Sequence, residues 1–88
     1  MLERDIERAF VARVRALGGM ADKFTSPGKR SVPDRLVTLP GGRVLFVELK
    51  APGKKPTTGQ LKDHARRRTL GCDVRVIDTL EAVRAFPE

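Results

Sequence analysis

The chain reads Val-Leu-Phe-Val-Glu-Leu-Lys at residues 44–50, shortly after Val-Pro-Asp-Arg at residues 32–35. Five of the seven residues in the first stretch are apolar, which is typical of a strand inside a sheet. Because strand side chains alternate, we expect Glu48 and Lys50 on one face and Leu49 on the other. Charged groups at the end of such a strand are unfavourable unless they are paired or used. The stretch therefore predicts both an interior strand and a chemical site.

The rest of the chain predicts an α/β fold in the order helix, three strands, helix, strand, helix. Pro40-Gly-Gly42 predicts a hairpin between the second and third strands. The helix between the third and fourth strands is expected to act as a crossover, which favours parallel pairing of these two strands. The expected strands are 20–25, 35–39, 43–50 and 72–77. The expected helices are 2–17, 57–70 and a short final helix that is capped by Asp78 or Thr79 and runs through Phe86.

The second helix is expected to turn Leu61, Ala65 and Leu70 inward. Its start, Thr57-Thr58-Gly59-Gln60, has the spacing of a capping box, in which the glutamine returns to the Thr57 backbone. His64 lies one turn after the glutamine, where it could contact phosphate or act as a general acid. A histidine in such a place is more often a partly exposed surface residue.

The 88 residues make one small domain, residues 1–88, with a modest, mostly aliphatic core that favours association with a second copy. Cys72 is the single cysteine, which excludes an internal disulfide and a cysteine-based zinc cluster. No apolar run suggests a signal or a membrane span. We therefore expect a soluble protein of a reducing compartment, the cytoplasm, with no membrane partner.

Positive charge is concentrated in the middle of the chain. Residues 23–68 hold 12 of the 18 lysines and arginines but only three acids, Asp34, Glu48 and Asp63. A basic surface is the expected footprint of a phosphate-backbone partner, although a solvated surface that keeps the protein in solution has the same composition. Arg35 could instead pair with a neighbouring acid. The candidate DNA contacts are Lys29, Arg30, Arg35, Lys54, Lys55, Arg66, Arg67 and Arg68.

Asp34, Glu48 and the backbone carbonyl of Leu49 are oxygen donors that could share one divalent ion. Hard oxygen donors suit Mg²⁺ or Mn²⁺ rather than zinc. Lys50 beside that ion could orient or deprotonate an attacking water and stabilise charge on phosphorus. Pro33 fixes the backbone just before the first carboxylate. The alternative for the charged end of the strand is an ordinary ion-pair face.

Taken together, these motifs resemble the VRR-NUC (virus-type replication-repair nuclease) family of the PD-(D/E)xK nuclease superfamily. The resemblance covers almost the whole chain and implies a restriction-endonuclease-like core, a mixed sheet flanked by helices. Ser31 stands where the family commonly has glycine, which matters if that backbone needs a positive φ. The matching residues are Glu3, Gly18-Gly19, Lys23-Phe24, Ser26-Pro-Gly28, Val32-Pro-Asp34-Arg35, Pro40-Gly-Gly42, Phe46-Val-Glu-Leu-Lys50, Ala51-Pro-Gly53 and Gln60.

The resemblance implies that Asp34 and Glu48 bind metal and that Lys50 assists the nucleophile. It also implies that Glu3 is an additional carboxylate ligand from the first helix. On a helical wheel Glu3 lies at the margin of the apolar stripe, and Glu7 lies about 40° further toward solvent. Glu3 is therefore preferred and Glu7 is its rival, although both acids also suit the positive N-terminal end of a helix.

The activity that the resemblance implies is Mg²⁺-dependent hydrolysis of phosphodiesters in branched DNA, including four-way (Holliday) junctions, with Mn²⁺ as a substitute. A homodimer would match the two equivalent cuts of such a junction. For Gln60 the resemblance implies a place near the active site, which is compatible with a capping box. All four phenylalanines are expected in the core, so backbone and shape recognition is favoured over base recognition. A non-catalytic nucleic-acid-binding module and a nuclease for flaps or other DNA ends remain the alternatives.

Overall fold

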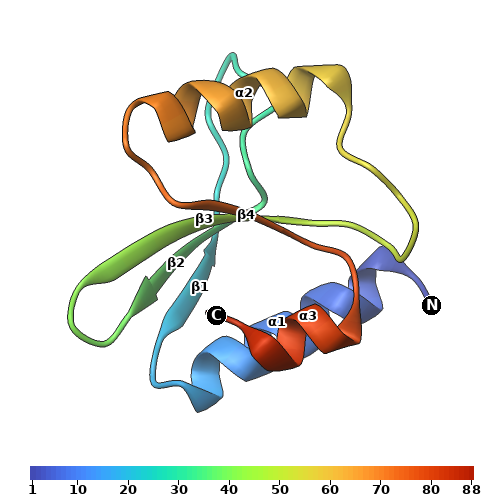
Figure 1. Ribbon diagram of the computed structural model, residues 1–88, viewed down its shortest axis with the longest axis vertical. Coiled ribbons are helices and arrows are strands. Elements are labelled where there is room, and N and C mark those ends of the chain that lie inside the picture. The colour runs from blue at the N-terminus through green and yellow to red at the C-terminus, as the bar shows by residue number, and fades with distance from the viewer.

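The computed structural model describes residues 1–88 and contains one four-stranded sheet with helices on both faces (Figure 1). Helices α1 and α3 cover one face, and α2 covers the other. The predicted α/β fold and element order are confirmed, with ends that differ by one or two residues. The elements are α1 (Glu3–Ala16), β1 (Met20–Lys23), β2 (Arg35–Leu39), β3 (Arg43–Leu49), α2 (Thr58–Thr69), β4 (Val74–Ile77) and α3 (Leu80–Ala85).

The strands lie side by side in chain order, β1-β2-β3-β4. The first two pairings are antiparallel, and β3 pairs with β4 in parallel as the crossover through α2 predicts. Gly41 and Gly42 have φ values of 87° and 81°, a conformation that favours glycine, and they make the tight turn between β2 and β3. None of the three helices has the length and apolarity that crossing a membrane requires.

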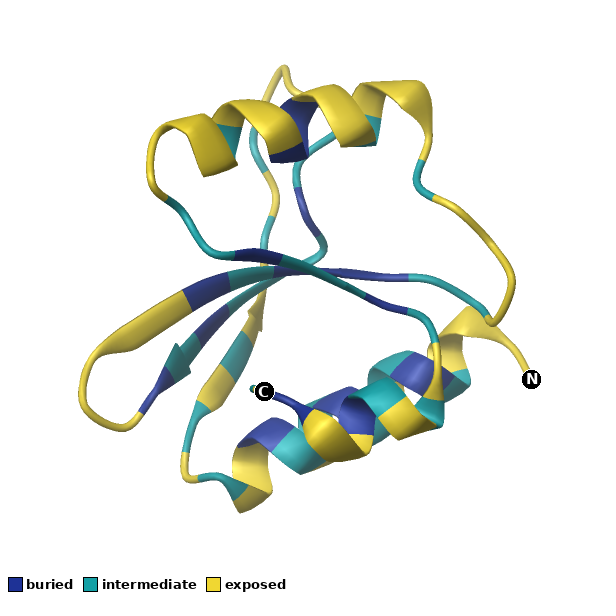
Figure 2. Ribbon diagram, in the orientation of Figure 1, coloured by how far each residue is buried: buried dark blue, intermediate teal, exposed yellow.

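The hydrophobic core lies between the sheet and the layer formed by α1 and α3 (Figure 2). Phe10 of α1 meets Phe86, just after α3, edge to face with ring centroids 4.9 Å apart. This geometry stabilises aromatic pairs beyond their burial. One stripe of α1 packs against the inward residues of β3, and the buried members of these two elements are Ile6, Phe10, Val14, Leu45, Val47 and Leu49.

Helix α2 does not bury the predicted residues. Leu61 and Leu70 are 53% and 66% exposed, and Ala65 is exposed as well, so the predicted inward face was wrong. Asp63 and His64 are buried instead. The sheet face under α2 carries the charged end of β3, so the helix turns side chains with polar atoms toward it. A few apolar residues at helical spacing did not outweigh these contacts.

The four phenylalanines divide between the two faces of the sheet. Phe10 and Phe86 are buried in the core as predicted, whereas Phe24 and Phe46 are only partly buried. The rings of this second pair have centroids 5.5 Å apart, and the Arg67 guanidinium lies over both, 5.4 and 4.8 Å from their centroids. Such cation–π contacts attach α2 to the sheet, and they cover these rings.

Gly19 connects α1 to β1 in very close contact with the neighbouring strand. A Cβ atom added there would lie 2.5 Å from the Thr38 carbonyl oxygen and 2.9 Å from Leu39 Cδ2. Pairing between β1 and β2 fixes that backbone oxygen. We therefore expect Gly19→Ala to lower the free energy of unfolding by about 1–3 kcal/mol, as overpacking does. Urea denaturation measures this change.

Gly59→Ala is the matched control. Its added Cβ would lie 2.7 Å from Ser31 Oγ, a side-chain atom that can rotate away, and alanine favours the helix by up to about 1 kcal/mol. We expect little net change in the free energy of unfolding. An equal loss in both variants would contradict the role of backbone contact at Gly19. All positive φ values belong to glycines, so Ser31 fits its backbone without strain.

Candidate active site

The charged end of β3 lies beneath α2. Glu48 and Lys50 project toward that helix, whereas Leu49 enters the core on the opposite face. Lys50 Nζ lies 3.8 Å from Glu48 Oε2, and its side chain is 14% exposed. The Lys50 backbone N–H donates to the Ile77 carbonyl at 3.0 Å. The strand pairing therefore continues far enough to position the lysine.

Asp34 lies against the same end of β3, at the start of β2. Its Oδ2 accepts a hydrogen bond from the Leu49 N–H at 2.8 Å, and its own carbonyl accepts one from the Phe24 N–H at 2.9 Å. Pro33, the preceding residue, is buried. The turn and strand thus bring the two carboxylates of the sequence motif, Asp34 and Glu48, into one site.

Glu48 is a strongly perturbed carboxylate. Burial raises the pKa of Glu48 to about 8, and a hydrogen bond with the Asp34 side chain and the negative charge of Asp34 contribute to this rise. The charge of Lys50 opposes this rise, and the charge of Glu3 adds to it. Oε1 of Glu48 is buried and accepts no hydrogen bond. A desolvated carboxylate with an unsatisfied oxygen favours a nearby cation.

Gln60 makes the predicted capping box and also contacts Glu48. The side-chain Oε1 of Gln60 accepts a hydrogen bond from the Thr57 backbone N–H at 2.9 Å. The backbone N–H of Gln60 donates to Thr57 Oγ1 at 3.2 Å, which completes the capping box. The other end of the amide, Nε2, donates to Glu48 Oε2 at 3.1 Å. The first turn of α2 is thereby tied to the carboxylate.

His64 is fully buried, so it is neither a surface residue nor free to reach a phosphate directly. Its Nε2 lies 3.4 Å from Glu48 Oε1, and neither ring nitrogen makes a hydrogen bond. Burial, and then the positive charge of Arg68, lowers the pKa of His64, which keeps the ring neutral at pH 7. The imidazole closes the side of the site that faces α2.

The two acids of α1 have different surroundings. Oε2 of Glu7 accepts hydrogen bonds from Arg35 Nη2 and Nε at 3.0 and 3.3 Å, and Arg35 Nη1 donates to the Ala21 carbonyl at 2.7 Å. Arg35 therefore pairs with a neighbouring acid, one of its two predicted alternatives. Glu3 is exposed, and its charge acts on Glu48. These surroundings favour Glu3 over Glu7, and its role as a ligand stays a prediction.

The predicted DNA contacts differ in how free their charges are. Arg67 donates to Asp63 Oδ2 at 2.8 Å and lies over two rings, so its guanidinium is engaged within the protein. Lys29 lies 3.4 Å from Asp63 Oδ1 but remains 58% exposed. Although burial opposes it, hydrogen bonds from Arg67 and Lys29 lower the pKa of Asp63. The exposed candidates that make no hydrogen bond or ion pair are Arg30, Lys54, Lys55 and Arg66, whereas Arg68 is exposed but donates to the Val74 carbonyl at 2.8 Å.

Sequence reasoning missed the buried carboxylate of Asp63. It pairs with Arg67 on the same helix and links α2 to the loop before β2 through Lys29. The spacing of Asp63 and Arg67, four residues apart on one helix, was the available signal. This network holds α2 over the site.

The oxygen donors of the site fit a hard divalent cation such as Mg²⁺. Asp34 and Glu48 supply adjacent carboxylates, and Glu48 Oε1 lacks a partner. The structure holds no cluster of three or more side chains drawn from the one histidine, the one cysteine, the aspartates and the glutamates that could by itself hold a metal ion. The fit therefore depends on this pair, with water completing the coordination shell.

Known proteins resemble the chain over nearly its full length, although no protein-family model matches it. It is 53% identical over 85 residues to "Putative nuclease p44" of Acyrthosiphon pisum secondary endosymbiont phage 1, which covers 97% of this chain and 91% of that protein. A solved structure described as "VRR_NUC domain" has a TM-score of 0.89 and 36% sequence identity, covering 94% of this chain and 90% of the other. The chain therefore belongs to the VRR-NUC family of nucleases.

Proposed function

We propose that this nuclease is a Mg²⁺-dependent endonuclease that hydrolyses phosphodiesters in branched DNA, with four-way junctions as its main substrate and Mn²⁺ as a substitute ion. The observation that carries the proposal is the pair Asp34 and Glu48, with Lys50 beside it, at the end of β3. The surrounding segment is strongly basic, so DNA phosphates can approach these acids.

In this proposal Asp34, Glu48, the Leu49 carbonyl and Glu3 hold the ion. When bound, the ion would lower the pKa of a water molecule and stabilise negative charge on the phosphate. Lys50 would donate hydrogen bonds to the attacking water or to the phosphate oxygens, and its low exposure strengthens these interactions.

The remaining contacts hold these groups in place. The Leu49 N–H holds Asp34 through a 2.8 Å hydrogen bond, and the Gln60 amide holds Glu48 through one of 3.1 Å. Both partners belong to regular elements, a strand and a helix, so the carboxylates start from a defined geometry. Such preorganisation is what charge stabilisation in a transition state requires.

Branched DNA and a homodimer are supported by general arguments. A four-way junction presents two equivalent phosphodiesters, which a twofold-symmetric dimer would engage together. Phe24 and Phe46 are covered by Arg67, so they offer no open surface for stacking bases. Recognition of DNA through its phosphates and shape is therefore favoured over recognition of its bases.

The test is a cleavage panel on matched four-way, flap and linear DNA. We expect Mg²⁺- or Mn²⁺-dependent cleavage that is fastest on the four-way junction. Lys50→Ala and Asp34→Ala should each reduce the cleavage rate by about 100- to 1,000-fold, because each removes a charge from the site, while DNA binding stays measurable. Lys62→Ala, an exposed lysine of α2 without an ion pair, is the control and should cleave normally.

Several outcomes would contradict this proposal. Binding without cleavage of any substrate in either ion would support a non-catalytic binding module instead. Faster cleavage of flaps than of four-way junctions would support the nuclease activity and reject the four-way junction as the main substrate. Light scattering under assay conditions measures the oligomeric state, and an active monomer would reject the dimer.

Gln60→Glu separates the two tasks of Gln60. Glutamate still completes a capping box, so α2 should keep its helical circular dichroism. A carboxylate would then replace the donor that faces Glu48 at 3.1 Å, and cleavage should fall by about 10- to 100-fold, as it does when a group supporting a metal ligand is lost. Normal cleavage would show that only the helix cap matters. Thr57→Ser, which keeps both contacts, is the control.

Metal affinity should depend on pH through Glu48. Its pKa of about 8 means that it is largely protonated below that pH, whereas binding an ion requires the carboxylate. Apparent Mg²⁺ affinity should fall by up to about tenfold for each pH unit below 8 and level off above it. The rise in Tm with added Mg²⁺ measures affinity without relying on activity. Glu48→Gln should bind weakly with no such pH dependence, and a wild-type affinity that is flat with pH would contradict this.

A further inference from the structure

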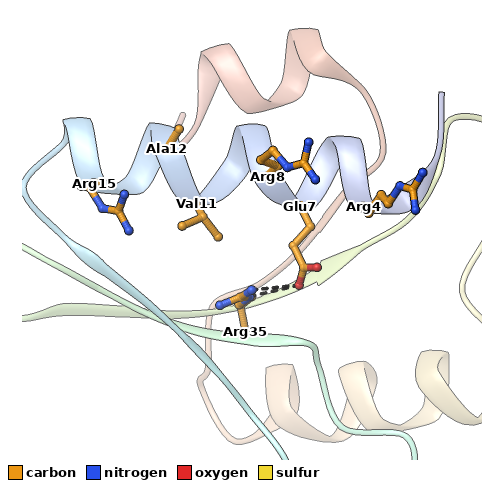
Figure 3. Close-up of a pocket in the computed structure, with 7 residues that line it drawn as sticks. All are labelled: Arg4, Glu7, Arg8, Val11, Ala12, Arg15 and Arg35. Atoms are coloured by element: carbon orange, nitrogen blue, oxygen red, sulfur yellow. Dashed lines mark hydrogen bonds and ion pairs between the residues drawn. The ribbon is translucent and has the colours of Figure 1, made fainter.

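A second basic surface lies along α1, outside the residues predicted to contact DNA, apart from Arg35. It is an open groove of about 420 Å³, and four of its seven lining residues are arginines, Arg4, Arg8, Arg15 and Arg35 (Figure 3). Glu7 is the only acid among them, and it pairs with Arg35 at the side of the groove opposite the helix. The groove therefore carries a surplus of positive charge.

The three arginines of α1 form one stripe. At about 100° per residue, Arg4, Arg8 and Arg15 fall within about 40° of each other on the helical wheel, and they span about 16 Å along the axis. All three are exposed, and none makes a hydrogen bond or an ion pair. Figure 3 shows them in a row along α1, with Arg35 across the groove from them.

This arrangement is unfavourable for the protein alone. Arg4 and Arg8 are like charges one helical turn apart, a spacing at which like charges repel. The lone acid of the groove is already engaged by Arg35, and Asp22 lies in the adjoining hollow that Arg15 also lines. A polyanion would remove this repulsion. Free guanidinium groups donate paired hydrogen bonds to phosphate oxygens.

Two residues that line the groove also follow proposed active-site residues directly in the sequence. Glu3, the proposed ligand from α1, immediately precedes Arg4, and Asp34 immediately precedes Arg35. A DNA strand with its scissile phosphate at the carboxylates could therefore continue along α1. Along one strand, phosphates advance by about 3.4 Å per step, so the stripe spans about five steps.

We propose that the α1 groove binds the phosphate backbone of a DNA arm next to the phosphodiester that is cut. This inference rests on the proposed function for its substrate. The three free arginines of the groove supply affinity that is independent of base sequence, and the arm that they hold sets the direction in which DNA leaves the site.

The test measures DNA binding in the presence of EDTA, where no cleavage occurs. A short fluorescent duplex is titrated at several salt concentrations with wild type and with Arg8→Ala/Arg15→Ala. We expect the double variant to bind the duplex about tenfold more weakly. The slope of log K plotted against log salt concentration should be shallower by about 1.8, which is about 0.9 for each of the two lost phosphate contacts. Arg8→Lys/Arg15→Lys, which keeps both charges, should retain most of the slope.

Arg84→Ala is the matched control for Arg8→Ala. Arg84 is also an exposed helical arginine, but it lines a different groove between α1 and α3. Each change removes one positive charge, so a non-specific effect of net charge would be equal in the two variants. We expect a shallower slope only for Arg8→Ala. Equal slopes for the two variants, or wild-type binding by the double variant, would overturn the proposal. Circular dichroism confirms that each variant is folded.

The same proteins, assayed with Mg²⁺ on a four-way junction, separate this proposal from the nuclease itself. Cleavage by wild type combined with unchanged binding by the double variant would reject the groove and keep the nuclease. If the double variant shows the expected shallower salt dependence of DNA binding but wild type cleaves no DNA, the groove is supported as a DNA-binding site and the catalytic proposal is rejected. A wild-type protein that does not bind DNA would reject both.

Discussion

The buried carboxylate of Glu48 is the constraint on which the α2 side of this structure depends. It lies at the end of an interior strand, almost without solvent, where an unpaired charge is strongly unfavourable. The neighbours reduce that penalty only in part, since Gln60 donates one hydrogen bond and Lys50 supplies an opposite charge 3.8 Å from Oε2. The protein alone therefore holds this group largely protonated near neutral pH, and a cation in the site would reverse that preference.

This constraint explains why the two faces of the sheet have different roles. The face toward α1 and α3 carries the apolar core and stabilises the domain, and it holds none of the site's charged groups. The face toward α2 carries the carboxylates and buries His64 and Asp63 with incomplete hydrogen bonding. Buried polar groups that lack partners lower stability, and such sites are common where function requires them. Contacts through Arg67 and Lys29 hold α2 in place despite this loss.

The sequence predicted those parts of the fold that depend on local signals. Apolar runs marked β3, paired glycines marked the hairpin, and the crossover helix implied the parallel pair. The inward face of α2 was not predictable from its periodicity, because its contacts are set by polar groups distant in sequence. At the site, alternation placed Glu48 and Lys50 together, but no local pattern shows that Arg35 engages Glu7 or that His64 is buried.

Helix α1 contributes both to the apolar core and to the charged side of the structure, because its different stripes carry different kinds of side chain. Its apolar stripe closes the core, the charge of Glu3 acts on Glu48, and its arginine stripe faces the open groove. A single helix with 3.6 residues per turn can carry three such stripes only if each is narrow. Changes to the arginine stripe should therefore alter binding while leaving the core and the carboxylates intact.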